Sequence, residues 1–451
     1  MKRNELIKGI KTVFSTNIVV VLFGIINGIV LPKYLSIDSY AQIKTFQLYY
    51  AYLGLLHLGV ADALQIKYGG CDFNNVNKVE LSSELAVYRT FFLVEEILAV
   101  VVATLIDNYI VMALASTMLF TNIISCYKII YQATGNASGY GRTTLIISLL
   151  KFFANVAVIL SKSDSYIFLI TAYVVIDIII CIVTEFKHSF LFIKFLNNKI
   201  TILLEGIKIG FPILIGNFIV NLLMSIDRWY VKFGGINTEF AYYSFAVSIQ
   251  QLAITMFKPF QIALYSFLCK NKDDYKKIGD SCSCIVAISA ISCSLIFPIK
   301  WMIRSFISKY VFAISVVVIL FATIIPNGVI NSVYINLYKV YGNQKKYFWR
   351  SFLVVVTAAF LDLIVFINGG AIEKYAVATL VVSMIWYAIS YYDFRHIATC
   401  RYDILKVIMS IAVLLLSNIV LPEVFGFVAY AMTIVLIHLR AIKKIYNVIA
   451  Q

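Results

Sequence analysis

The stretch NFIVNLLMSIDRWYVKFGG, residues 217–235, closes a long apolar run that begins near Ile200. A run of this kind predicts a membrane-spanning helix, because about 20 apolar residues in an α-helix cross the hydrocarbon core of a bilayer. Asp227 and Arg228 nevertheless lie side by side within it. A charged side chain at the bilayer centre costs about 2.5–3.5 kcal/mol on insertion scales, so charges kept there indicate that part of the helix faces protein or water.

The composition of the whole chain agrees with a membrane protein. Of its 451 residues, 61% are hydrophobic and 14% are charged, which is too apolar for a soluble protein of this length. The net charge of +15 does not indicate nucleic acid as a partner, because the basic residues lie between apolar runs and form no basic domain. The eight cysteines show no recurring metal or redox spacing, so we expect no cofactor and no metal site.

Fourteen apolar segments are long enough to be membrane-spanning helices. Connections rich in Lys and Arg alternate with connections that carry few, which predicts an even number of spans with cytoplasmic N- and C-termini. The last two segments are short, so a re-entrant hairpin is an open alternative for them. The predicted spans are 12–32, 41–63, 82–106, 109–131, 143–161, 165–186, 204–231, 240–267, 281–303, 311–334, 351–369, 373–392, 405–421 and 424–440.

The connection 187–203 divides the chain near its middle and is itself apolar and basic. It reads as an amphipathic helix on the cytoplasmic leaflet. Weakly similar segments, IDSYAQIKTFQLYYAY and INTEFAYYSFAVSIQQ, follow the first and the seventh spans. Repeated halves with a site between them are a common plan of transporters. The predicted organisation is a six-helix half at 1–186, the linker at 187–203, a second six-helix half at 204–392, and a helix pair with a basic tail at 393–451.

A helical wheel separates the two adjacent charges of the opening stretch. Successive residues of a helix are about 100° apart, so Asp227 and Arg228 face different neighbours. Arg228 falls on one stripe with Asn217 and Asn221, whereas Asp227 points to another element, such as the next span or the outer loop.

Polar stripes also follow the first, second and eighth predicted spans. A water-filled substrate cavity is one interpretation; helix packing through amides is the other, and Arg228 and Lys44 could equally extend to the membrane interface. Tyr243, Tyr265, Asp62 and Gln65 lie on these stripes as well. The residues predicted to line the cavity are Asn17, Asn27, Lys44, Gln47, Asn217, Asn221, Arg228, Gln250, Gln251, Lys258 and Gln261.

Other charges and helix breakers suggest structural roles. Lys151 and Asp177 lie at equal depth on consecutive antiparallel spans, which predicts an ion pair. Pro212 frees a backbone carbonyl within its helix, and we expect it to form a hinge with Gly210 and Gly216. Four further charges in predicted spans have no partner evident in the sequence, and pairing and ion coupling are both open for them. They are Arg89, Glu95, Glu96 and Asp362.

Two stretches and the overall layout resemble a known family. They are GIINGIVLPKYLSIDSYAQIKTFQLYYAYLGLLHLGV (24–60), in which a Gly-containing first helix ends at a Pro, and GIKIGFPILIGNFIVNLLMSIDRWYVKFGGINTEFAYYSFA (206–246), with the Asp-Arg pair. With two six-helix halves and an extra C-terminal pair, the chain resembles the lipid-linked oligosaccharide flippases, the polysaccharide-transporter branch of the multidrug/oligosaccharidyl-lipid/polysaccharide (MOP) superfamily.

The resemblance implies an all-α protein of the bacterial cytoplasmic (inner) membrane whose halves enclose a cavity. It implies that a polyprenyl-diphosphate-linked glycan crosses this cavity from the cytoplasmic to the outer leaflet. It further implies a coupling ion, proton or sodium, and a polysaccharide polymerase as a partner. The basic stripes agree with this substrate, because Lys and Arg form charge-assisted bonds with phosphate oxygens.

Three other functions are alternatives to this one. A cation-coupled multidrug exporter of the same superfamily would be expected to carry a carboxylate in the first span, where this chain has none, although Asp177 keeps the alternative open. A peptidoglycan lipid-precursor flippase would suit fourteen spans but would be expected to have more Arg in the first span. A polytopic polymerase or ligase would need a sizeable outer loop with catalytic residues, so we expect no enzyme.

Overall fold

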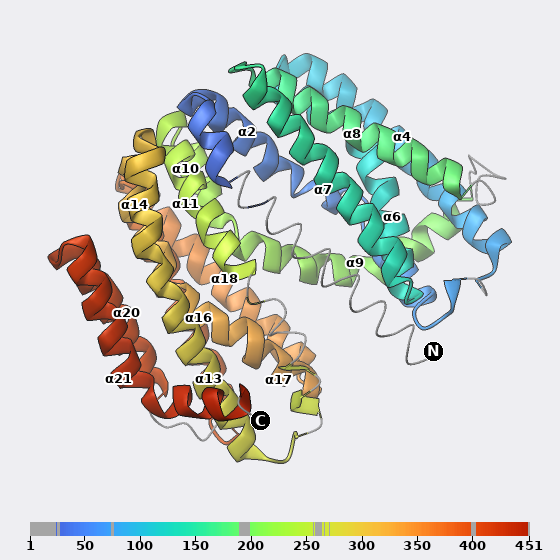
Figure 1. Ribbon diagram of the computed structural model, residues 1–451. Coiled ribbons are helices and arrows are strands. Elements are labelled where there is room, and N and C mark those ends of the chain that lie inside the picture. Colours follow the sequence, from blue (N-terminus) through green and yellow to red (C-terminus); the bar gives the residue numbers. More distant parts are fainter. Residues whose placement is uncertain are drawn as a thin grey trace. The chain divides into compact units, whose positions relative to one another are not determined.

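The computed structural model shows a chain whose regular secondary structure is helical throughout the residues it describes. Contacts divide the chain into two compact units, Met1–Asn221 and Leu222–Gln451 (Figure 1). The predicted linker at 187–203 lies mostly outside the described residues, so the predicted domain boundaries stay a prediction. The described residues are 24, 28–73, 76–188, 199–255, 257, 264–265, 267–269, 271–397 and 403–449.

Within these described residues, eight helices are long and apolar enough to cross a membrane. They are nine if the pair Tyr109–Ala115 and Met118–Ala133, bent by 44°, counts as one span. The protein is therefore an all-helical, multi-pass integral membrane protein. The count of fourteen spans stays a prediction, since the segment 12–32 lies mostly outside the described part of the chain.

The first unit is built from short and long helices with polar caps. Asn77 accepts hydrogen bonds from the backbone N–H groups of Val79 and Glu80, and Ser165 accepts one from Phe168, as residues before a helix commonly do. Its elements are α2 (Ile37–Tyr50), η1 (Leu53–Leu55), α3 (Val60–Lys67), α4 (Lys78–Ile106), α5 (Tyr109–Ala115), α6 (Met118–Ala133), α7 (Ala137–Leu160), α8 (Tyr166–Lys187) and α9 (Ile200–Leu223), whose last two residues belong to the second unit.

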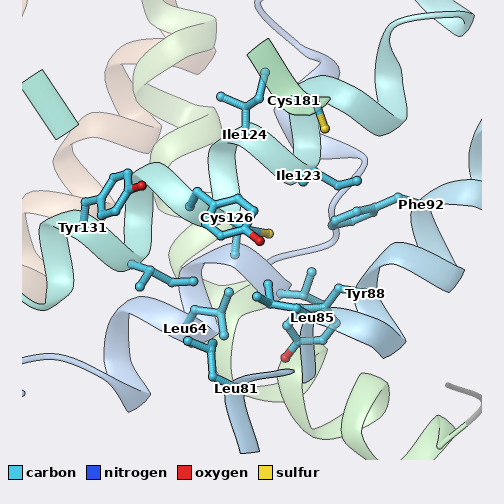
Figure 2. Packing of buried hydrophobic residues seen from close by; sticks show 14 of the residues in the cluster. Leu64, Leu81, Leu85, Tyr88, Phe92, Ile123, Ile124, Cys126, Tyr131 and Cys181 are labelled. Carbon is cyan, nitrogen blue, oxygen red and sulfur yellow. The ribbon is translucent and has the colours of Figure 1, made fainter. Parts of the chain in front are cut away.

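The core of the first unit joins α3, α4, α6 and α8 (Figure 2). Apolar and aromatic side chains such as Leu64, Tyr88 and Cys126 are buried together there. Arg89 lies beside this core and is only 2% exposed, but it forms a two-pronged ion pair with Glu185, with Nη2 2.8 Å from Oε2. The sequence left Arg89 without a partner, and the structure supplies one from α8.

The predicted span 41–63 is not one continuous helix, which corrects the sequence-based expectation. The α2 helix ends at Tyr50, and Leu58 and Gly59 adopt left-handed backbone angles, φ 46° and 90°, before α3 begins. The backbones of Gly59 and Gly210 are in such close contact that a side chain on either would collide with the other. Two glycines thus allow the start of α3 to touch α9 directly.

The second unit contains the remaining helices. Within it α20 and α21 pack side by side (red in Figure 1) and against α13, where the Tyr430 hydroxyl donates to the Ala290 carbonyl at 2.7 Å. The elements are α10 (Ile226–Phe233), α11 (Asn237–Thr255), α13 (Tyr275–Ser292), η4 (Cys293–Leu295), α14 (Ile296–Phe306), η5 (Ser308–Ala313), α15 (Ile314–Ala322), α16 (Ile324–Val329), η6 (Ile330–Tyr334), α17 (Ile335–Val340), α18 (Gln344–Ile367), α19 (Ile372–Asp393), α20 (Asp403–Val420) and α21 (Glu423–Ile449).

The opening stretch of sequence is also broken. The α9 helix ends at Leu223, and α10 begins at Ile226 after a turn at Met224 and Ser225. A rotation of 100° per residue therefore does not continue from Asn217 to Arg228. The predicted common stripe of these two residues loses its geometric basis.

Candidate functional site

Two polar cavities lie within the first unit and share Gly54, Ser125 and Lys128 in their linings. The larger, of about 370 Å³, is lined by residues of α2, α6, α7 and α8. The smaller, of about 290 Å³, extends to α3 and α9. Both volumes are near the lower limit of about 300–1,000 Å³ that is usual for ligand pockets.

The larger cavity contains the ion pair that the sequence predicts. Lys151 Nζ lies 3.0 Å from Asp177 Oδ1, and the Tyr50 hydroxyl donates to Asp177 Oδ2 at 2.8 Å. The Asp177 side chain is 3% exposed and that of Lys151 is 22% exposed. This carboxylate therefore joins three helices, α2, α7 and α8.

Lys128, which is not among the residues predicted from the sequence, lines both cavities. Its Nζ lies 5.3 Å from the centre of the Tyr140 ring, and no carboxylate among the described residues is within ion-pairing distance of it. Lys128 and Lys151 repel each other electrostatically. Lys128 lies inside the predicted span 109–131, and that position is the signal that could have identified it.

The smaller cavity receives two of the predicted residues, Asn217 and Asn221, both from α9. Asn217 Nδ2 donates to Asp62 Oδ1 at 3.4 Å. Asp62 is 4% exposed, and its Oδ2 has no hydrogen-bond partner among the described residues. His57 also lines this cavity, and its Nδ1 accepts the backbone N–H of Gly59 at 3.0 Å.

A third cavity, of about 490 Å³, lies between α3, α4 and α9 and has acidic walls. Lys67 pairs there with Glu80 at 2.6 Å and with Glu84. Burial opposes the charged form of Lys67, but the hydrogen bonds and charges of the two carboxylates outweigh it and raise the pKa of Lys67. Lys67 therefore keeps its positive charge, which Glu80 and Glu84 balance, whereas Lys128 has no such carboxylate partner among the described residues.

The second unit holds a pair of buried carboxylates. Asp227 Oδ2 accepts hydrogen bonds from the Tyr243 hydroxyl at 2.6 Å and from Thr379 Oγ1 at 3.2 Å. This confirms the expectation that Asp227 faces the following span rather than Arg228. Asp362 of α18 is 2% exposed, interacts electrostatically with Asp227, and has an Oδ1 atom without a hydrogen-bond partner among the described residues.

This carboxylate pair has the chemistry of a site for a small cation or a proton. Both carboxylates are buried, and burial and like charge both disfavour the ionised form, so a proton or a small cation would stabilise them. No Lys or Arg among the described residues forms an ion pair with Asp227 or Asp362. The described residues contain no cluster of three or more His, Cys, Asp or Glu side chains that could hold a metal ion.

Other predicted cavity residues have contacts of a different kind. Gln250 is a correction: it is buried, and its Nε2 donates to Leu320 O at 3.2 Å and to Thr323 Oγ1 at 2.6 Å. A helical wheel identifies a polar face but does not distinguish a cavity from a hydrogen bond to the neighbouring helix. Gln251 lies half-buried next to it on α11.

Arg228 and Lys44 have local partners. Arg228 Nη2 donates to the Met224 carbonyl at 3.2 Å, across the turn that precedes α10. Lys44 Nζ donates to Gln47 Oε1 at 3.0 Å on α2. The remaining predicted cavity residues lie outside the described part of the chain; they are Asn17, Asn27, Lys258 and Gln261.

The predicted hinge residues differ from one another. Pro212 lies inside α9, which continues through it. Gly210 serves the close contact with Gly59, whereas a side chain on Gly216 would meet no atom within 4 Å. Bending at Pro212 stays a prediction, and Gly210 has a packing reason of its own.

Comparisons with known proteins identify the fold. No protein-family model matches the chain, and no curated protein sequence matches it. An inward-closed structure of the lipid II flippase MurJ is similar over 99% of this chain and 100% of that chain, with a TM-score of 0.73 and 16% identity. An inward-facing multidrug resistance MATE family transporter of the MOP superfamily is similar over 88% of this chain and 98% of that chain, with a TM-score of 0.58 and 11% identity. A MATE in complex with MaL6 is similar over 90% of this chain and 95% of that chain, with a TM-score of 0.53 and 12% identity. The chain therefore has the fold of MOP superfamily transporters.

Proposed function

We propose that the protein is a flippase that moves a polyprenyl-diphosphate-linked oligosaccharide from the cytoplasmic to the outer leaflet for surface polysaccharide assembly. The observation that carries the proposal is the full-length similarity to a lipid II flippase, with a TM-score of 0.73 against 0.58 for the multidrug transporter. The basic cavity around Lys128 and Lys151 supports an anionic substrate, because ammonium groups form charge-assisted hydrogen bonds with phosphate oxygens.

Transport would proceed by alternating access, with the two units rocking and α9 bending near Pro212. With both termini in the cytoplasm, an inside-negative membrane favours outward movement of an anion by about 2.3 kcal/mol per charge per 100 mV. The return of the empty protein would then be coupled to uptake of a proton or sodium ion at Asp227 and Asp362.

Two other functions share parts of this support. A peptidoglycan lipid-precursor flippase has the same head-group chemistry, since it also moves a lipid-linked diphosphate. A cation-coupled multidrug exporter would use the carboxylate pair of the second unit. A sugar-specific assay is therefore needed to separate the three.

The test is transport by the purified full-length protein in proteoliposomes. Fluorescent polyprenyl-diphosphate oligosaccharide, lipid II and a cationic dye are supplied separately, and a membrane-impermeant quencher measures their arrival in the opposite leaflet. We expect the oligosaccharide lipid to move at least ten times faster than in protein-free vesicles, and the dye not to move. Movement of lipid II alone would replace the proposal with the peptidoglycan function, and movement of the dye alone would replace it with drug export.

A further inference from the structure

We infer that Lys128 and Lys151 form an anion-binding site inside the first unit, in the cavity between α2, α6, α7 and α8, and that this site takes the phosphate groups of a lipid-linked diphosphate. The inference rests on the proposed function for the identity of the lipid. It assigns a phosphate-binding role to residues of the first unit alone.

The first argument is the charge of the cavity. Lys128 and Lys151 line it together with one carboxylate, Asp177, which Lys151 and Tyr50 already engage. Lys128 has only the ring of Tyr140 as a favourable neighbour among the described residues. Lys128 is half-buried, and a cation–π contact of about 0.5–2 kcal/mol leaves its charge without a counter-ion. The side chains that line the cavity therefore carry two positive charges and one negative charge.

The second argument is independent of charge. Asn122 Nδ2 and Thr144 Oγ1 line the same cavity, are buried, and have no hydrogen-bond partner among the described residues. Asn122 is only 1% exposed. Buried donors without acceptors are rare in folded proteins and cost about 1–3 kcal/mol each. A ligand rich in acceptor oxygens would satisfy both.

The donors around the cavity suit a phosphate group. Each lysine offers three N–H donors, Asn122 offers two, and the hydroxyl groups of Ser125 and Ser148 add further donors. The acidic cavity around Lys67 differs in charge, because Glu80 and Glu84 balance the charge of its lysine. Lys128 lines two of the three first-unit cavities described above, and the larger of these two is the one that combines surplus positive charge with the unused donors of Asn122 and Thr144.

Asp177 gives the site a way to respond to its ligand. Its Oδ1 atom lies 3.0 Å from Lys151 Nζ, and its Oδ2 atom accepts a hydrogen bond from the Tyr50 hydroxyl at the end of α2. A phosphate that draws Lys151 away from Asp177 weakens the link between α7 and α8. Tyr50, which donates to Asp177, is the last residue of α2, and the chain continues from it into the interrupted segment that contains the left-handed residues Leu58 and Gly59.

The experiment measures binding to the full-length protein in neutral-lipid nanodiscs. The probes are farnesyl diphosphate, inorganic pyrophosphate and the uncharged alcohol farnesol. We expect Lys128→Gln to weaken farnesyl diphosphate binding at least tenfold, Lys128→Arg to restore part of it, and the exposed control Lys187→Gln to leave it unchanged. Asp177→Asn should tighten binding several-fold, because it frees Lys151. Farnesol should not compete.

Each outcome decides something. Unchanged binding in a folded Lys128→Gln variant, or weaker binding in Asp177→Asn, overturns the site. Equal affinity for pyrophosphate and farnesyl diphosphate keeps the anion site but overturns its assignment to a lipid-linked substrate. If anionic phosphatidylglycerol nanodiscs abolish binding, the site belongs to a lipid head group instead.

Failure of this inference is separable from failure of the proposed function. A Lys128→Gln variant that still flips the oligosaccharide lipid at the wild-type rate, with unchanged binding, refutes the site and leaves the flippase intact. A wild-type protein that binds farnesyl diphosphate through Lys128 but flips no oligosaccharide lipid refutes the flippase and leaves the site. The fold is monitored by thermal stability, which Lys128→Met should leave unchanged or raise, since it removes a half-buried charge that has no carboxylate within ion-pairing distance among the described residues.

Discussion

Buried charges form two contrasting sets in this molecule. In the first set, buried carboxylates face cations: Glu185 pairs with Arg89 and Asp177 with Lys151 in the first unit, and Asp393 pairs with Arg350 in the second. In the second set, the buried carboxylates Asp227 and Asp362 form no ion pair with any described residue. A paired charge can be structural, whereas an unpaired buried charge is stabilised by a mobile partner, a cation or a proton for a carboxylate and an anion for a lysine such as Lys128. We propose that this difference separates charges that hold the fold from charges that take part in transport.

The largest effect is expected at the ion pair beside the core. Arg89→Ala should lower the free energy of unfolding by about 3–5 kcal/mol, because it leaves Glu185 buried and uncompensated. The measurement is thermal stability by fluorescence-detected size-exclusion chromatography. The double variant Arg89→Leu, Glu185→Leu should recover most of the loss. A double variant as unstable as the single ones would show that the pair does not act as a unit.

The next effect tests Asp227 in the second unit. Asp227→Ala leaves the hydroxyl of Tyr243, which is fully buried, without its acceptor, so we expect a loss of about 2 kcal/mol in stability. Tyr243→Phe removes the donor instead and should cost less, since the carboxylate keeps Thr379. The same thermal assay measures both. Equal stability of wild type and Asp227→Ala would mean that relief of repulsion with Asp362 outweighs the lost hydrogen bond.

A smaller effect is expected at Lys151 and Asp177. Lys151 is 22% exposed, so each single change to Ala should cost about 1 kcal/mol, well below the Arg89 effect. The double change should recover part of it. A double-mutant cycle on thermal stability gives the coupling energy. A coupling energy near zero would mean that Lys151 and Asp177 are in contact without stabilising each other, and the pair would not belong with the paired structural charges.

Features of the fold and the site could be predicted from the sequence where they depend on residues close together in the chain or on neighbouring helices. The helical membrane fold and the pairing of Lys151 with Asp177 followed from apolar length and equal depth on neighbouring helices. The partner of Arg89 did not, because Glu185 is far along the chain and the register of α4 against α8 is set by tertiary packing. The relation between Asp227 and Asp362 was not predictable for the same reason, since they lie on α10 and α18, which are far apart in the sequence.

The helix breaks explain most of the remaining differences. The wheel for 204–231 assumed one helix, and the turn at Met224 and Ser225 separates Arg228 from Asn217. The predicted span 41–63 is interrupted between Tyr50 and Val60, and the close backbone contact of Gly59 with Gly210 is one that no local pattern reveals. Gln250 shows a further limit, since a polar face of a helix can satisfy a neighbouring carbonyl as well as face water.

The smallest effect on stability, and the sharpest test of the comparison, is expected from Asp362→Asn. The substitution keeps the shape of the side chain and removes one of two like charges, so stability should stay the same or rise slightly. Transport in proteoliposomes should at the same time lose its dependence on an imposed sodium or proton gradient, because the neutral amide lacks the charge that attracts the cation and does not exchange a proton. The exposed control Lys374→Gln, on the neighbouring helix α19, should change neither property. A variant that is destabilised as strongly as Asp227→Ala and keeps its gradient dependence would show that Asp362 holds the fold like the paired carboxylates, and the distinction between paired and unpaired buried charges would fail.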